Sequence, residues 1–147
     1  MIALSIITRR LKDGKTYDDF RRAWYHTTGF GTGSKLYSAI DVFDPRQIIV
    51  VGFMTIPPDR DPMEILRIDV KERLENPLED VIEPEIGRVY GILVSEDDFS
   101  AEGTNAYRPA SIDGEETDFG EISQALNLAQ RLIATAFAER DEARSRV

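Results

Sequence analysis

The only histidine of the chain, His26, lies two residues beyond the only tryptophan, Trp24. An imidazole has an unperturbed pKa of about 6.5, so it can accept or donate a proton near neutral pH. We therefore consider His26 a candidate general base. On a helical wheel, however, His26 lies off the stripe that contains Trp24. The alternative is a surface histidine in the last turn of a helix, where a cation favours the negative end of the helix dipole.

Aromatic and cationic side chains supply the other candidate binding groups. Tyr37, Tyr90, Tyr107 and Arg108 offer polar groups to a bound molecule, and Trp24 offers a flat apolar surface. Each has a structural alternative as well. A tyrosine hydroxyl often forms a hydrogen bond at the edge of a core, and a tryptophan is more often core than substrate platform.

Metal and phosphate sites are not expected. The chain has no cysteine and a single histidine, which argues against a structural zinc site, and we expect no cofactor. The glycine-rich stretch Gly29–Lys35, GFGTGSK, is similar in composition to a phosphate-binding loop. A true phosphate loop follows a strand and opens a helix, whereas this stretch follows a predicted helix and precedes a predicted strand.

Length and charge set further limits. The 147 residues suit one domain, and 27 acidic against 18 basic residues give a net charge of −9, which argues against nucleic acid as a partner. The apolar opening, Met1–Ile7, precedes Arg9 and Arg10, whereas a signal peptide has its charges first. No apolar run approaches the ~18 residues of a membrane span. We expect a cytoplasmic protein without a membrane partner.

The stretch from Thr16 predicts an amphipathic helix. Thr16 and Asp19 have the spacing of a capping box, Phe20 and Trp24 share one stripe, and Gly29 is a natural end. The pattern indicates about three turns that bury two aromatic rings.

Apolar runs and turn residues place the remaining elements of the first two-thirds of the chain. A second helix should start at Asp61, and a short irregular or helical piece should lie between Pro77 and Pro84. The predicted strands are Ile2–Leu11, Lys35–Phe43, Gln47–Ile56 and Arg88–Ser95. This β-α-β-β-α-β order predicts an α+β, ferredoxin-like domain over residues 1–97, with helices on one face of a four-stranded antiparallel sheet.

Two predicted strands lack the alternation of an antiparallel sheet with one wet face. Ile48–Met54 and Val89–Val94 are apolar almost throughout. Both faces of the sheet should therefore be covered, one by the helices and one by a second copy of the chain. The sequence predicts a homodimer.

The last third of the chain divides into a loop and a helix. Residues 98–117 contain glycine, proline and acidic residues without a clear period, and we expect a long loop there. Asp118 and Glu121 have capping-box spacing, and an apolar stripe follows them. We expect residues 118–147 to form a C-terminal helical extension that packs on the same domain, with the preceding loop as a lid or a plain tether.

The element order and the helix-one motif resemble the dimeric α/β-barrel superfamily, and its EthD-like branch in particular. That branch carries F-R-x-x-W followed by a histidine, which Phe20, Arg21, Trp24 and His26 match. The resemblance implies a pocket between helices and sheet. It also implies a small-molecule enzyme, such as a cofactor-independent oxygenase or isomerase, that acts on an apolar or aromatic substrate with His26 as its proton carrier. Haem bound by His26 is a further alternative from the same family.

A second function class remains open beside the enzyme. Ferredoxin-like domains also serve as non-catalytic ligand-binding or assembly modules, and a fold does not decide between the two.

Overall fold

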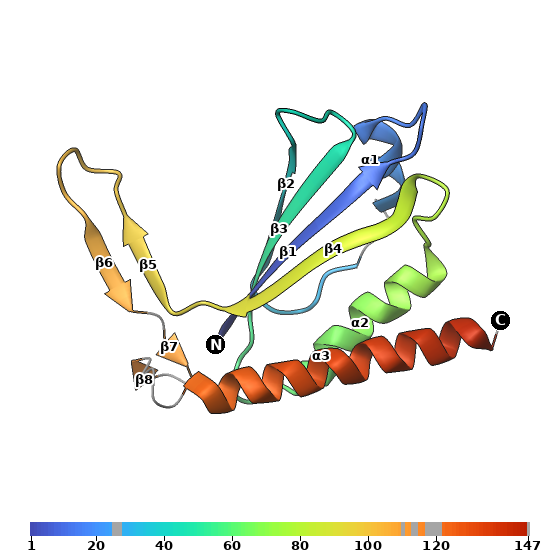
Figure 1. Ribbon diagram of the computed structural model, residues 1–147. Helices are drawn as coiled ribbons and strands as arrows, with labels where there is room; N and C mark the ends of the chain where they lie inside the picture. The colour runs from blue at the N-terminus through green and yellow to red at the C-terminus, as the bar shows by residue number, and fades with distance from the viewer. Residues whose placement is uncertain (25–27, 110, 113–114, 117–121, 147) are drawn as a thin grey trace.

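The computed structural model describes residues 1–24, 28–109, 111–112, 115–116 and 122–146 (Figure 1). The elements follow one another as β1 (Ile2–Leu11), α1 (Tyr17–Trp24), β2 (Ser34–Ile40), β3 (Gln47–Thr55), α2 (Pro62–Glu75), β4 (Ile82–Ile92), β5 (Ser95–Asp98), β6 (Ala106–Pro109), β7 (Ser111–Ile112), β8 (Glu115–Glu116) and α3 (Ile122–Ser145). Among the described residues, no helix is both long enough and apolar enough to cross a lipid bilayer.

The main sheet has the strand order β2-β3-β1-β4, and every neighbouring pair is antiparallel. The predicted α+β class with a four-stranded antiparallel sheet is confirmed. β1 lies in the interior of the sheet and pairs with β3 from Ile2↔Thr55 to Arg10↔Gln47. Side chains of β1 therefore have neighbours on both sides, on each face of the sheet.

The two faces of the sheet differ in burial. Along β3, Ile48, Val50 and Gly52 are buried, whereas Ile49 and Val51 are only partly buried. Neighbouring residues on a strand point to opposite faces, so one continuous apolar run supplies both a buried face and an accessible one. The described part of a single chain covers the buried face alone.

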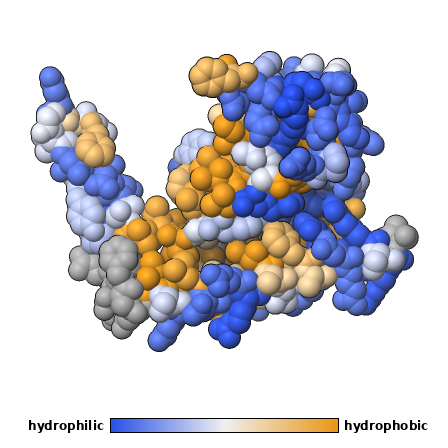
Figure 2. Space-filling view, viewed as in Figure 1, coloured by the Kyte–Doolittle hydropathy of each residue, from blue (hydrophilic) through white to orange (hydrophobic). Residues whose placement is uncertain are grey.

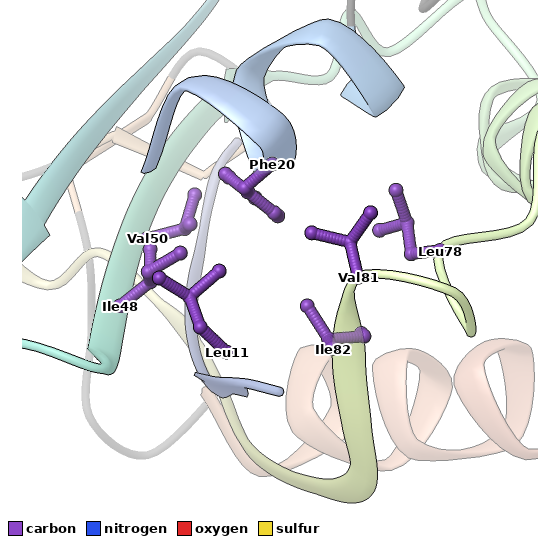
Figure 3. Close-up of a cluster of buried hydrophobic side chains, with 7 residues drawn as sticks. All are labelled: Leu11, Phe20, Ile48, Val50, Leu78, Val81 and Ile82. Atoms are coloured by element: carbon purple, nitrogen blue, oxygen red, sulfur yellow. The ribbon is translucent and has the colours of Figure 1, made fainter. Parts of the chain in front are cut away.

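The packed core occupies one end of the buried face, beneath α1. Figure 3 shows its side chains turned toward one another: Leu11, Phe20, Ile48, Val50, Leu78, Val81 and Ile82. Phe20 from α1 and Ile48 from β3 are almost fully buried, at 2 % and 0 % exposure. α1 thus seals this end of the sheet with an aromatic ring, as predicted for its inner stripe.

The capping box of α1 forms as predicted. The backbone N–H of Thr16 donates to Asp19 Oδ2 at 2.8 Å, and the Asp19 N–H donates to Thr16 Oγ1 at 3.3 Å. α1 is described from Tyr17 to Trp24, about two turns, and the residues of the predicted third turn, 25–27, lie outside the described residues.

α2 also starts as predicted. The Met63 N–H donates to Asp61 Oδ1 at 2.9 Å, and Pro62 stands at the first helical position. Proline is well suited to that position because its missing N–H would have no helical partner there.

The irregular piece predicted between Pro77 and Pro84 is present but shorter than expected. Residues 78–81 are irregular, whereas β4 begins at Ile82 and includes Pro84. β4 is an edge strand of the main sheet, and an edge strand tolerates a proline because the missing N–H faces away from the ladder.

The expected loop over residues 98–117 contains paired strands and is also corrected. β5 pairs with β6, β7 pairs with β8, and Gly103 with φ +71° lies between β5 and β6. These short strands are mostly polar, so they lack the apolar period that marks a strand in sequence. In Figure 1 the β5–β6 hairpin projects away from the sheet and helices.

α3 lies alongside α2 (Figure 1). Arg67 of α2 donates to both carboxylate oxygens of Glu139 at 3.2 and 3.0 Å, and Arg144 donates to Glu79 at 3.1 Å. The predicted cap residues Asp118 and Glu121 lie outside the described residues.

The capping box makes the stability of the protein depend on pH. The hydrogen bond from the Thr16 N–H, with help from Arg22, lowers the pKa of Asp19 to about 2. A lowered pKa in the folded state means that the stabilisation is present above the unfolded pKa of about 4 and is lost as the pH falls toward about 2. We expect Asp19→Ala to lower the melting temperature at pH 7 and to differ little from the wild type near pH 2. Equal losses at both pH values would contradict this.

Candidate functional site

A cavity of about 630 Å³ lies between the sheet and helices α2 and α3. It occupies the end of the buried sheet face that α1 does not seal. Figure 2 shows apolar surface gathered in the hollow between the sheet and helices α2 and α3. This volume is in the usual range for small-molecule sites.

Strand alternation and small residues create the space. Ala3, Ser5 and Ile7 of β1 line the cavity, as expected for alternate residues of one strand. Gly52 of β3 also lines it, and a Cβ at Gly52 would lie only 2.8 Å from Ser5 Oγ. The close approach of these two strands therefore requires the missing side chain.

The helices supply the opposite wall. Leu66 and Val70 of α2 line the cavity, and so do Ile133 and Phe137 of α3. The C-terminal helix, α3, thus forms part of the cavity wall.

One end of the cavity is polar. Arg9 of β1, Asp69 of α2 and Tyr90 of β4 line it together with Trp24. Arg9 is only 6 % exposed, although it is a charged residue in an interior strand. It follows Ser5 and Ile7 on the same face of β1, so the alternation that builds the cavity also buries this guanidinium.

Two guanidinium groups lie over the ring of Trp24. The distance from Cζ to the ring centroid is 4.8 Å for Arg9 and 4.6 Å for Arg73. Phe20 lies beside Trp24, with 5.5 Å between the ring centroids. Cation–π attraction is strongest at tryptophan and grows when the pair is desolvated, so Trp24 stabilises cations at the edge of the core.

The charged groups at the polar end of the cavity shift one another's pKa values. Burial lowers the pKa of Arg9 to about 10; Asp69 acts in the opposite direction, while Arg73 and Arg88 add to the lowering. Desolvation by the surrounding protein raises the pKa of Asp69 against the pull of the same three arginines, although the Asp69 side chain is exposed to solvent. Burial also raises the pKa of Tyr90. Perturbed groups gathered in a pocket are typical of functional sites.

Phe137 extends the polar cluster to α3. Its ring lies 6.1 Å from that of Tyr90, and the Cζ atoms of Arg88 and Arg140 lie 5.4 and 4.8 Å from its centroid. Phe137 of α3 therefore meets the edge strand β4 at the cavity.

Two of the predicted binding residues, Trp24 and Tyr90, lie together at the cavity. Tyr37 does not, because it pairs with Val51 on the opposite, accessible face of the sheet. It is 58 % exposed and meets Phe53 edge-on at 6.4 Å.

The remaining predicted site residues are also outside the cavity lining. Tyr107 and Arg108 belong to β6, and Tyr107 is 63 % exposed on the projecting hairpin. Neither residue lines the cavity, and the hairpin projects away from the sheet and helices in Figure 1, so the lid hypothesis for these two residues is not supported. His26, the predicted general base, lies outside the described residues.

Sequence reasoning missed Arg9 and Asp69. A signal for Arg9 was available, because it shares the alternate positions of Ser5, Ile7 and Leu11 on a strand predicted to be buried. Asp69 gave a weaker signal, since it stands next to Val70 on a helix whose apolar stripe is irregular.

Comparison of the chain with protein-family models, curated proteins and solved structures finds no match. Within the part of the chain that the structure describes, no three His, Cys, Asp or Glu side chains are close enough together to hold a metal ion. The function must therefore be argued from the cavity.

The raised pKa of Asp69 predicts a stability change with a definite sign. Below its ordinary pKa of about 4 the carboxyl is protonated in both states, whereas above the raised folded pKa it is ionised at a cost to the fold. We expect Asp69→Asn to melt at a higher temperature than the wild type at pH 7, and the difference to disappear below pH 4. Asp80→Asn, at an exposed position that does not line the cavity, is the control. A gain that does not depend on pH would contradict the electrostatic explanation.

Proposed function

We propose that this protein binds a small, largely apolar molecule in the cavity between the sheet and helices α2 and α3. The observation that carries this proposal is the cavity of about 630 Å³, walled by hydrocarbon side chains and polar at one end. Binding sites for small molecules combine apolar walls with a few polar groups that fix orientation.

A specific observation favours proton-transfer chemistry as a second candidate. Asp69 lines the cavity and its pKa is raised, which brings a carboxyl group closer to the range of a general acid or base. The enzyme expected from the EthD-like resemblance would then act on an apolar or aromatic substrate, with Asp69 beside it.

We also propose that the domain is ferredoxin-like and forms the homodimer of a dimeric α/β barrel. The β-α-β-β-α-β order over Ile2–Ile92 and the strand order β2-β3-β1-β4 support the fold. An apolar row on the accessible face supports the dimer: the register aligns Tyr37, Val51, Ile6 and Val89 across the four strands. Val89 is 62 % exposed there. Exposed apolar patches of this kind mark interaction surfaces.

The binding proposal is tested with N-phenyl-1-naphthylamine, a neutral dye that fluoresces in apolar sites. We expect wild-type protein to enhance its fluorescence. Ala129→Phe should weaken binding at least about tenfold, or about 1.4 kcal/mol, because Ala129 lines the cavity and the added ring occupies it. Ala138→Phe places the same ring at an exposed position of α3 that does not line the cavity. Equal effects of the two variants would place the dye elsewhere and contradict the proposal.

The dimer is tested by light scattering at micromolar concentration. We expect a dimer for the wild type and a folded monomer for Val51→Asp, which places a charge on the accessible face. Val50→Asp should instead unfold the protein, because Val50 is 2 % exposed in the core and a buried unpaired charge is strongly destabilising. A wild-type monomer would rule out the dimer and leave the cavity proposal standing.

A further inference from the structure

The polar end of the cavity holds a cluster of charged groups. Arg9 lines the cavity together with Asp69, the acidic residue of the lining, while Arg73 and Arg88 act on Asp69 without lining the cavity themselves. Glu72 of α2 adds a second negative charge nearby, and its two carboxylate oxygens accept hydrogen bonds from Thr28 at 3.4 Å and Asn76 at 3.1 Å. Three arginines thus gather at one place in a chain whose net charge is −9.

The Arg9 guanidinium is buried without a hydrogen-bond acceptor. Its Nε and Nη1 atoms have almost no accessible surface and no partner among the described residues. Trp24 attracts the positive charge at 4.8 Å, but a ring face does not replace a carboxylate. Leaving a buried charged donor unpaired is expensive, and such groups are usually compensated. Arg9 is 6 % exposed and is one of the residues that line the cavity.

We propose that the ligand of this cavity is an apolar molecule with a single carboxylate, and that Arg9 binds this carboxylate. The inference rests on the proposed function and specifies its ligand. The planar donor fork of an arginine matches a carboxylate, and hydrogen bonds between ionised groups are about twice as strong as neutral ones. Beyond the polar end, side chains such as Ile7, Met54, Ile92 and Leu132 provide the wall for an apolar body.

Asp69 should affect the affinity for a carboxylate ligand in the direction opposite to Arg9. Its carboxylate lines the same end of the cavity and repels a bound anion, while it would attract a bound amine. Removing Arg9 and removing Asp69 must therefore change the affinity for a carboxylate in opposite directions.

The test compares three eight-carbon probes by titration calorimetry: octanoate, 1-octanol and octylamine. We expect octanoate to bind wild-type protein at least about tenfold tighter than the other two, as a hydrogen bond to a charged group allows. Arg9→Met should reduce octanoate binding to the level of octanol, and Asp69→Asn should strengthen it. Octanoate should also change the fluorescence of Trp24, the only tryptophan, which lies against Arg9.

Arg10→Met is the matched control. Arg10 is the next residue of β1, but it pairs with Asp44 rather than lining the cavity, so octanoate affinity should not change. Equal affinities for octanoate and octanol, tighter binding of octylamine, or an Arg9→Met protein that folds and retains full octanoate affinity would overturn the carboxylate assignment and leave the cavity as a neutral binding site. If none of the three probes binds, and the naphthylamine dye does not bind, both proposals fail. A failure of Arg9→Met to fold leaves Asp69→Asn and the probe series to decide.

Discussion

The arrangement of α1, α2 and the sheet depends on the burial of one guanidinium group, that of Arg9. Transfer of such a charge from water to a protein interior is costly, and its lowered pKa reflects that cost. The structure offsets part of it with the ring of Trp24 from α1 and with the carboxylate of Asp69 from α2. Arg73 of α2 lies over the same ring, so Trp24 links α1, α2 and β1 at a single point. Beyond this point toward Phe20 the sheet is packed; in the other direction it opens into the cavity.

The cavity exists because large and small side chains are segregated along one face of the sheet. At the α1 end, Phe20, Ile48 and Val50 fill the space with large side chains. At the other end Ala3, Ser5 and Gly52 are small, and α2 and α3 bridge the remaining gap. The ion pairs between these regions, Arg67 with Glu139 and Arg144 with Glu79, are exposed, and pairs of that kind contribute about 1 kcal/mol or less. Apolar contact along the cavity wall must therefore hold α3 in place. A ligand in the cavity would add to that contact and stabilise the folded protein, increasingly so as its concentration rises above its Kd.

The same strands present a different chemistry on their two faces. Toward the helices, β1 carries Ser5, Ile7 and Arg9, while Ile6 joins the apolar accessible face with Val51 and Val89. Because a shift of register by one residue would exchange the two faces, the pairing of β1 with β3 and β4 fixes both the cavity and the accessible apolar row. The cavity on one face and the exposed apolar row on the other are thus set by one pattern of backbone pairing.

The sequence alone determined the elements whose signals are local. The capping pair Thr16 and Asp19, the start of α2 at Asp61 and Pro62, and the long apolar strands are properties of neighbouring residues, and from their order followed the α+β class with its antiparallel sheet. The inclusion of Pro84 in β4 depended on the edge position of that strand. The polar segments after Ile92 pair as local hairpins, but they lack the apolar period that would have marked them as strands in the sequence. The site depended on tertiary structure still more. Trp24 and Tyr90 could be named as candidates from residue type, but the sequence could not separate Tyr90 from Tyr37, since register and face decide which tyrosine meets the cavity. Nor could the sequence show that Arg9 and Asp69, 60 positions apart, line one cavity. The burial of these groups and their electrostatic interaction are properties of the packed chain and not of either residue.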